Sequence, residues 1–218
     1  MSQMPKSGDR KKKRDQRIAA LAFDRISEKD RRSRRCMSQI LLAGELHDAV
    51  VLCLKDGKLM PTAALLRSLI DTCVLGIWLL KYATEEQASD SVAHLSTIEI
   101  AKDVFSGNDK KMFAFLFQEV RGTDHEFYRD VLHPAIHGDA LHLAMRFRDK
   151  RATKTWVHKC IFHTNHVYVH FLLQSAGSGL VPPELQSYIK AESENSLSTM
   201  TALLKHPAWQ GIDEHLSE

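Results

Sequence analysis

Residues 60–83 read MPTAALLRSLIDTCVLGIWLLKYA, and this stretch decides the fold class. Apolar side chains run through it almost without interruption over more than six turns, which is typical of a helix buried on most sides. The only charged residues in its middle are Arg67 and Asp71. Because residues four apart lie on one face of a helix, the two side chains can pair. Burying a charge is costly unless it is paired, so we expect the pair to be at least half buried, as a structural clamp or as the start of a polar site.

The chain on either side of this stretch also favours helices. Helical periodicity begins near Arg17, bends or breaks between residues 29 and 35, and stops at Asp56-Gly57. Pro61 suits the first turn of the central helix, which we expect to end near residue 82. Further on, the pattern predicts a long helix over about 153–175, a loop at 177–183 and a last helix over about 183–204.

No alternation of the strand type persists, and the connections between the helical segments are short. We therefore predict an all-α protein, a single-domain bundle of seven to eight helices over residues 16–206. Residues 1–15 form a basic tail that we expect to be disordered, and residues 207–218 form a C-terminal tail. A length of 218 residues with 44% apolar residues is ordinary for one soluble domain.

The cysteines and the hydropathy indicate a cytoplasmic protein. Cys36, Cys53, Cys73 and Cys160 are scattered without metal-binding spacing, so we expect thiols kept reduced and mostly buried in helices. No secretory signal is recognisable. We expect no stretch to span a membrane, since the most apolar one is interrupted by the Arg67 and Asp71 charges.

The charge is uneven along the chain. The net charge is +3, but residues 1–35 carry thirteen basic and five acidic residues. A basic arm of this kind can touch nucleic acid, and its densest part is Arg10, Lys11, Lys12, Lys13 and Arg14. The plainer interpretation, which we favour, is a solvated tail that runs into an exposed helix.

A histidine-rich segment is the strongest local signature. It reads LHPAIHGDALHLAMR over residues 132–146, and His137 with Gly138 falls at a predicted bend. There His137 could project into the bundle and meet Arg67 and Asp71. In such a cluster Asp71 would orient the imidazole and Arg67 would hold an anion. The alternative, which we favour, is a polar clamp between two helices.

A second set of histidines lies on the predicted long helix, namely His158, His163, His166 and His170. Spacings of three and four place the last three near one stripe of the helix. Imidazoles on one face can bind zinc, but no carboxylate lies in that stretch to complete a ligand set. We therefore expect core or interface histidines, and neither a metal nor a cofactor.

The order of these motifs resembles an uncharacterised family of bacterial helical proteins. Its members carry an ALLR…E…GxWL segment, followed later by a short (T/V)HGG-like motif. Here the first segment is residues 63–80, and the second is Ile136-His137-Gly138-Asp139. Asp71 stands where the family has Glu, and Asp139 where it has a second Gly. The resemblance covers about residues 60–146 and implies an all-helical fold.

A looser similarity is to HEPN-type helical proteins, many of which are ribonucleases of toxin–antitoxin or phage-defence systems. Their signature is an Arg followed, after four to six residues, by a His, often at a dimer interface. Arg151 and His158 leave six residues between them, with Ala152 where the family has a polar residue. Arg129 leaves seven residues before His137 and does not fit.

Two functions are consistent with these observations. The first, which we favour, is a non-enzymatic bundle that acts by binding a partner or as a homodimer, with Arg67, Asp71 and His137 holding the core together. The second is a HEPN-like ribonuclease or defence effector. In it Arg67 would stabilise phosphate charge, His137 would be the general acid and base, and Asp71 would orient it. RNA therefore stays open as a partner.

Overall fold

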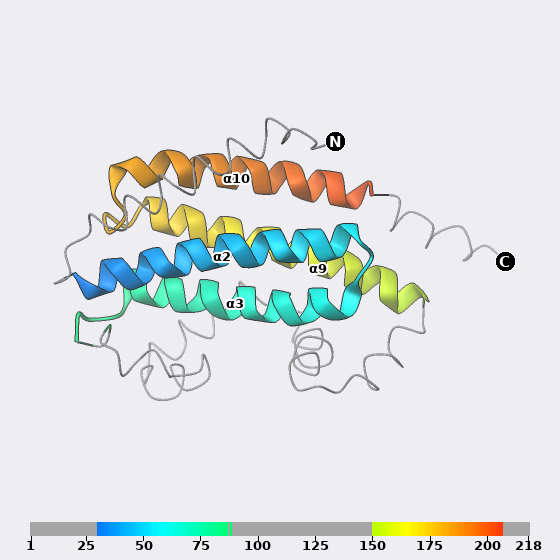
Figure 1. Cartoon of the computed structure of the whole chain (residues 1–218), viewed down its shortest axis with the longest axis horizontal. Coiled ribbons are helices and arrows are strands. Elements are labelled where there is room, and N and C mark those ends of the chain that lie inside the picture. The colour runs from blue at the N-terminus through cyan, green and yellow to red at the C-terminus, as the bar shows by residue number, and fades with distance from the viewer. Residues whose placement is uncertain (1–29, 87, 89–149, 207–218) are drawn as a thin grey trace, which may run out of the picture.

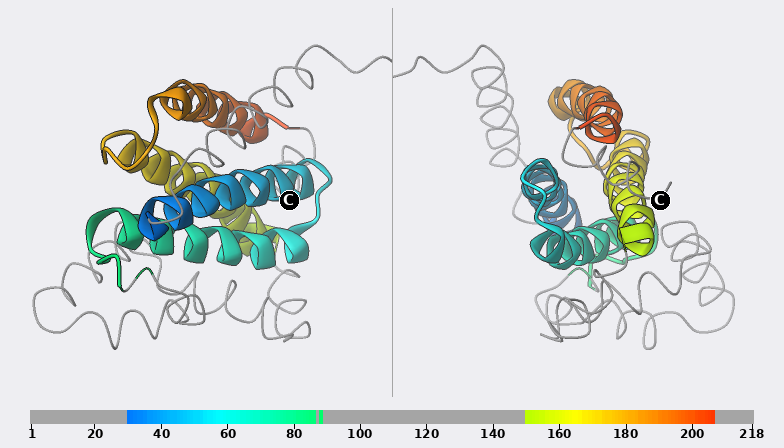
Figure 2. Two further views of the ribbon diagram at one scale, coloured as in Figure 1. Left: turned by 60° about the vertical axis from the view of Figure 1, so that its left-hand side comes forward. Right: turned by 90° about the vertical axis from the view of Figure 1, so that its right-hand side faces the viewer.

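The computed structural model describes residues 30–86, 88 and 150–206, which form four helices. These are α2 (Arg31–Lys55), α3 (Leu59–Lys81), α9 (Lys150–Ala176) and α10 (Pro183–Leu204). Helix α2 packs against α3, α3 against α9 and α9 against α10, and α10 also touches α2 (Figure 1). The end-on view in Figure 2 shows the four helices grouped as one bundle.

The described residues contain helices and no strand, so this part of the chain is all-α, as predicted. The remaining predicted helices fall in residues 1–29 and 89–149, outside the described residues. The count of seven to eight helices therefore stays a prediction. The predicted tails, 1–15 and 207–218, also lie outside the described residues.

The helix ends follow the local chemistry of the sequence. Helix α2 begins at Arg31 because the Asp30 side chain caps it, accepting a hydrogen bond of 3.0 Å from the Ser33 backbone N–H. The expected bend between residues 29 and 35 was thus placed too far along, since residues 31–35 are already helical. At the other end Gly57 takes φ 70°, a left-handed value that glycine adopts at no steric cost. The last helix spans Pro183–Leu204, the range that the sequence predicts.

The core lies between the four helices and includes the middle of α3. Leu66, Ile77 and Trp78 of that helix are each at most 1% exposed. Gly76 lets α3 and α9 approach closely, because a Cβ at this position would lie 2.2 Å from Cζ of Phe171. The glycine of the GxW motif therefore serves helix packing.

Arg32 fastens the start of α2 to the end of α3. Its Nε donates to the Leu79 carbonyl and its Nη2 to the Leu80 carbonyl, both at 2.5 Å. These carbonyls belong to the last turn of α3, where the backbone carbonyls have no N–H partner within the helix. A guanidinium at this negative end also favours the helix dipole.

By length and composition alone, α2 and α3 would each pass as a membrane span, which the sequence analysis did not expect. This is a weak indication, because the core helix of a soluble protein passes the same test. The apolar window of α3 is 72% buried inside the bundle, whereas that of α2 is 39% buried.

Candidate functional site

The predicted pair of Arg67 and Asp71 forms on α3. Arg67 Nε donates to Asp71 Oδ2 at 2.8 Å, and the two side chains are 8% and 30% exposed. Both are more than half buried, which confirms the expectation drawn from the apolar surroundings. The second carboxylate oxygen of Asp71, Oδ1, is buried and accepts no hydrogen bond from the described residues.

The burial of this pair limits what it can do chemically. A guanidinium that is 8% exposed and already donates to a carboxylate has little surface left for an anion from solution. Asp71 lies on the side of α3 that also carries the half-buried Ala64, Ser68 and Leu75, away from the fully buried face. The geometry is that of an ion-pair clamp in which the second carboxylate oxygen of Asp71, Oδ1, can accept one further hydrogen bond.

The other members of the predicted site lie outside the described residues. His137 falls within 89–149, and the basic arm Arg10, Lys11, Lys12, Lys13 and Arg14 falls within 1–29. Of the three residues in the candidate catalytic cluster, the described part of the chain contains two and brings them together. The role of His137 stays a prediction.

The histidines of α9 do not share one face in the way the sequence analysis expected. His163 is 4% exposed and belongs to the interior, whereas His158 and His166 are exposed and His170 is half buried. Among the described residues, no three His, Cys, Asp or Glu side chains gather closely enough to hold a metal ion. Spacing alone grouped His163 with His166 because it carries no information about which face packs inward.

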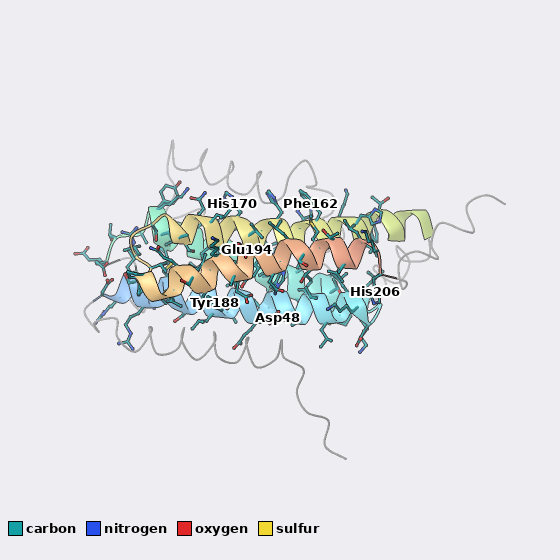
Figure 3. All side chains as sticks on the ribbon, turned by 90° about the horizontal axis from the view of Figure 1, so that it is seen from above. Asp48, Phe162, His170, Tyr188, Glu194 and His206 are labelled. Carbon is teal, nitrogen blue, oxygen red and sulfur yellow. The ribbon has the colours of Figure 1, made fainter. Side chains whose placement is uncertain are left out.

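The exposed row on α9 runs instead through positions 158, 162, 166 and 170, four residues apart. Phe162 is 52% exposed, and its ring lies 5.2 Å from that of His166 with an angle of 11° between the planes. The His166 and His170 rings follow at 6.3 Å and 16°. In Figure 3, Phe162 and His170 line the α9 edge of the bundle, on the side opposite Asp48. We call His158, Phe162, His166 and His170 the ring ladder.

A buried polar node, which was not predicted from the sequence, joins three helices. Ser196 Oγ of α10 donates to Asn165 Oδ1 of α9 at 2.8 Å, and His47 Nε2 of α2 lies 3.2 Å from the same oxygen. All three side chains are at most 1% exposed. The His47 ring also stacks on Tyr168, with centroids 4.5 Å apart.

His47 Nε2 lies 3.1 Å from Ser196 Oγ as well as 3.2 Å from Asn165 Oδ1, so the three polar groups contact one another. The Asn165 amide nitrogen donates to the Ile161 carbonyl at 2.7 Å, so the amide oxygen is the atom turned toward His47. An amide oxygen only accepts hydrogen bonds, so the contact of His47 Nε2 with Asn165 Oδ1 is a hydrogen bond in the tautomer that carries the proton on Nε2. Nδ1 then lies on the side of Asp48, whose Oδ1 is 3.9 Å away. His47, Asn165 and Ser196 look ordinary one by one in the sequence; a polar residue on an otherwise apolar face was the available signal.

Three of the four cysteines are buried thiols, as expected, and all four are free. Burial raises the pKa of Cys36 and of Cys160 to about 12, and it raises the pKa of Cys73 well above its ordinary value. A thiol that keeps its proton at neutral pH is a poor nucleophile and a poor metal ligand. These cysteines therefore belong to the core.

Comparisons with protein-family models, with curated proteins and with solved structures find no match to this chain.

Proposed function

We propose that this is a cytoplasmic, non-enzymatic helical-bundle protein that acts by binding a partner, and that the outer face of α9 is its binding surface. The observation that carries the proposal is the exposure of large apolar side chains on that face. Phe162 is 52% and Leu173 60% exposed. They lie eleven residues apart, close to three full turns, and so share one side of the helix.

The order of this surface supports the same proposal. The stacking of Phe162 on His166 holds both rings in place before any partner arrives, so little side-chain entropy is lost on binding. A row of apolar and aromatic side chains that is already ordered is typical of a binding surface rather than of scattered surface residues. The partner is another protein, a second copy of the chain or RNA.

The proposal gives Arg67 and Asp71 a structural role, as a clamp within a single-domain bundle of seven to eight helices. The burial of Arg67 and its contact of 2.8 Å with Asp71 support this role. In the complete bundle, His137 would donate to the open Asp71 oxygen and so connect its own segment to α3.

Photo-crosslinking in cells tests the proposal directly. A benzophenone amino acid replaces Phe162 in one variant and Leu52, which is 61% exposed on α2, in a matched control. We expect one discrete crosslinked product from position 162 and none from position 52. Equal, diffuse labelling from both positions would refute α9 as the binding surface.

A second function, a HEPN-like ribonuclease or phage-defence effector, is favoured by one observation. Asp71 Oδ1 is buried without a donor among the described residues, and an orienting carboxylate of that kind is what a catalytic imidazole at His137 would need. Purified wild type and His137→Ala are compared for RNA cleavage, with circular dichroism on both. Cleavage that is lost in a folded variant supports the enzyme, and no cleavage by the wild type refutes it.

A further inference from the structure

The outer face of α9 carries a regular seam of exposed and half-buried residues. They follow one another at spacings of four, three, four and three, namely Phe162, His166, Val169, Leu173 and Ala176. Phe162 and Leu173 keep 52% and 60% of their surface in solvent. A repeat that alternates between three and four residues is the pattern by which one helix packs along another. We call these five residues the α9 seam, and their spacing indicates that a helix covers them.

The α9 seam lies in an uncharged part of the chain, because residues 160–183 contain no Asp, Glu, Lys or Arg. The exposed leucines Leu42 of α2 and Leu197 of α10 differ in this respect. Glu45 follows the first and Glu194 precedes the second by three residues, a spacing that makes them neighbours on one helix face. A charged partner would bury its charges against the α9 seam without a counter-charge, which is costly. An uncharged helix face fits best, and a second copy of α9 supplies one.

We propose that the α9 seam of one copy packs antiparallel against the α9 seam of a second copy, with Phe162 of each copy against Leu173 of the other. This inference rests on the proposed function, because it names the partner of the same surface. The spacings from Phe162 to Leu173 are four, three and four, so they are the same in both directions along the helix. A two-fold axis between His166 and Val169 therefore places matching positions opposite each other. The result is a closed homo-oligomer of two copies.

The charges of α9 favour the antiparallel direction. All four basic residues of the helix lie among its first ten, namely Lys150, Arg151, Lys154 and Lys159. A parallel pair would bring the two basic ends together, where like charges repel each other. An antiparallel pair places each basic end beside the C-terminal end of the other helix, where the helix dipole is negative and favours positive charge.

The size of the α9 seam predicts a weak dimer. From Phe162 to Ala176 the helix is about 21 Å long, and a helix is about 10 Å wide. Such a strip has an area of about 200 Å² in each copy, well below the roughly 800 Å² per partner of a standard stable interface. We therefore expect a dimer that dissociates on dilution through the micromolar range.

Sedimentation velocity on the full-length protein tests the association. The concentrations run from about 5 to 300 μM, as a weak interface requires. We expect the sedimentation coefficient of the wild type to rise from the value of a monomer toward that of a dimer. Phe162→Asp should weaken the association at least about 30-fold, because it replaces an aromatic anchor by a carboxylate without a counter-charge. Leu52→Asp, at a 61% exposed position of α2, is the matched control and should associate as the wild type does. Circular dichroism shows that each variant is folded.

Disulfide crosslinking tests the antiparallel direction. Phe162→Cys and Leu173→Cys are made in separate proteins that both also carry Cys53→Ser, which removes the native thiol that is not buried. A mixture of the two proteins should form the mixed disulfide dimer under mild oxidation. Each protein alone should form little, since the same position in the two copies lies about 16 Å apart along the helix, beyond the reach of a disulfide.

The outcomes separate this inference from the proposal on which it rests. Dimers that Phe162→Asp abolishes and Leu52→Asp retains, together with the mixed disulfide, would support the inference. A wild type that stays monomeric, a dimer that Phe162→Asp leaves intact, or disulfide dimers from each cysteine protein alone would overturn it. If the crosslinker at position 162 captures a different protein or RNA, the binding surface stands and only the second copy is wrong. If it captures nothing and the wild type is monomeric, both proposals fail.

Discussion

Removing the carboxylate of Asp71 should destabilise the protein far more than removing both charges of its ion pair. In Asp71→Leu the guanidinium of Arg67, whose side chain is 8% exposed, loses the acceptor that lies 2.8 Å from its Nε. Breaking a buried pair in this way typically costs about 3–5 kcal/mol. Because Asp71 itself is 30% exposed, water reaches its end of the pair, and we expect about 3 kcal/mol.

The double variant Arg67→Met, Asp71→Leu removes the buried positive charge as well. A buried ion pair that is replaced by apolar side chains of similar size is close to neutral, so this variant should unfold within about 1 kcal/mol of the wild type. The free energies of unfolding come from urea titrations followed by circular dichroism. The single and double variants should therefore be strongly non-additive.

A matched control is available in the exposed ion pair of Lys58 and Asp56. Its atoms are 3.1 Å apart, but the side chains are 60% and 48% exposed. Lys58→Ala should cost less than about 1 kcal/mol, as exposed pairs usually do. If Asp71→Leu cost no more than Lys58→Ala, the Arg67–Asp71 contact would not be a buried clamp and the reasoning from burial would be wrong.

Three further predictions follow from single contacts, each measured by urea unfolding. Gly76→Ala should lower the free energy of unfolding by about 1–3 kcal/mol, because its new Cβ overlaps the Phe171 ring. Adding Phe171→Leu should recover part of that loss. An unchanged midpoint of urea unfolding in Gly76→Ala would contradict the close approach of the two helices. Arg32→Ala should cost about 2 kcal/mol by removing two charged hydrogen bonds to the end of α3, whereas the exposed Arg31→Ala should cost almost nothing. Burial raises the pKa of Cys160 from 9.0 to about 12. Between these two pH values the unfolded state releases the thiol proton, whereas the folded state keeps it. This thiol should therefore lower the free energy of unfolding by about 1.4 kcal/mol per pH unit between pH 9 and 12. Cys160→Ala should flatten that slope, and parallel pH profiles would show that the thiol does not contribute.

Local patterns in the sequence predicted the helices well. The limits of α10 were correct because Pro183 begins the helix and a Gly- and Pro-rich loop precedes it. The burial of Arg67 was also predictable, because a charged pair in the middle of a long apolar helix is buried together with the apolar side chains around it. These inferences succeed because helix periodicity, capping and breaking depend on residues that are close in the chain.

Residues far apart in the chain limited the prediction of the site. Spacing grouped His163 with His166, but packing turned His163 inward and left His166 outside beside Phe162. The node of His47, Asn165 and Ser196 was not predicted, because its members are separated by 118 and 31 residues. Which polar side chains meet depends on how the helices are rotated and aligned against each other.

The sequence by itself determined that the described part of this protein is helical, where α3 and α10 lie, and that Arg67 and Asp71 pair within α3. The tertiary structure alone decided that Gly76 receives the Phe171 ring, that Arg32 binds the end of α3, and that α9 exposes its ring ladder. The physical reason is the range of the interactions. Hydrogen bonds within a helix and the hydrophobic period are fixed over one or two turns, whereas the faces that helices share are fixed only when all of them pack together.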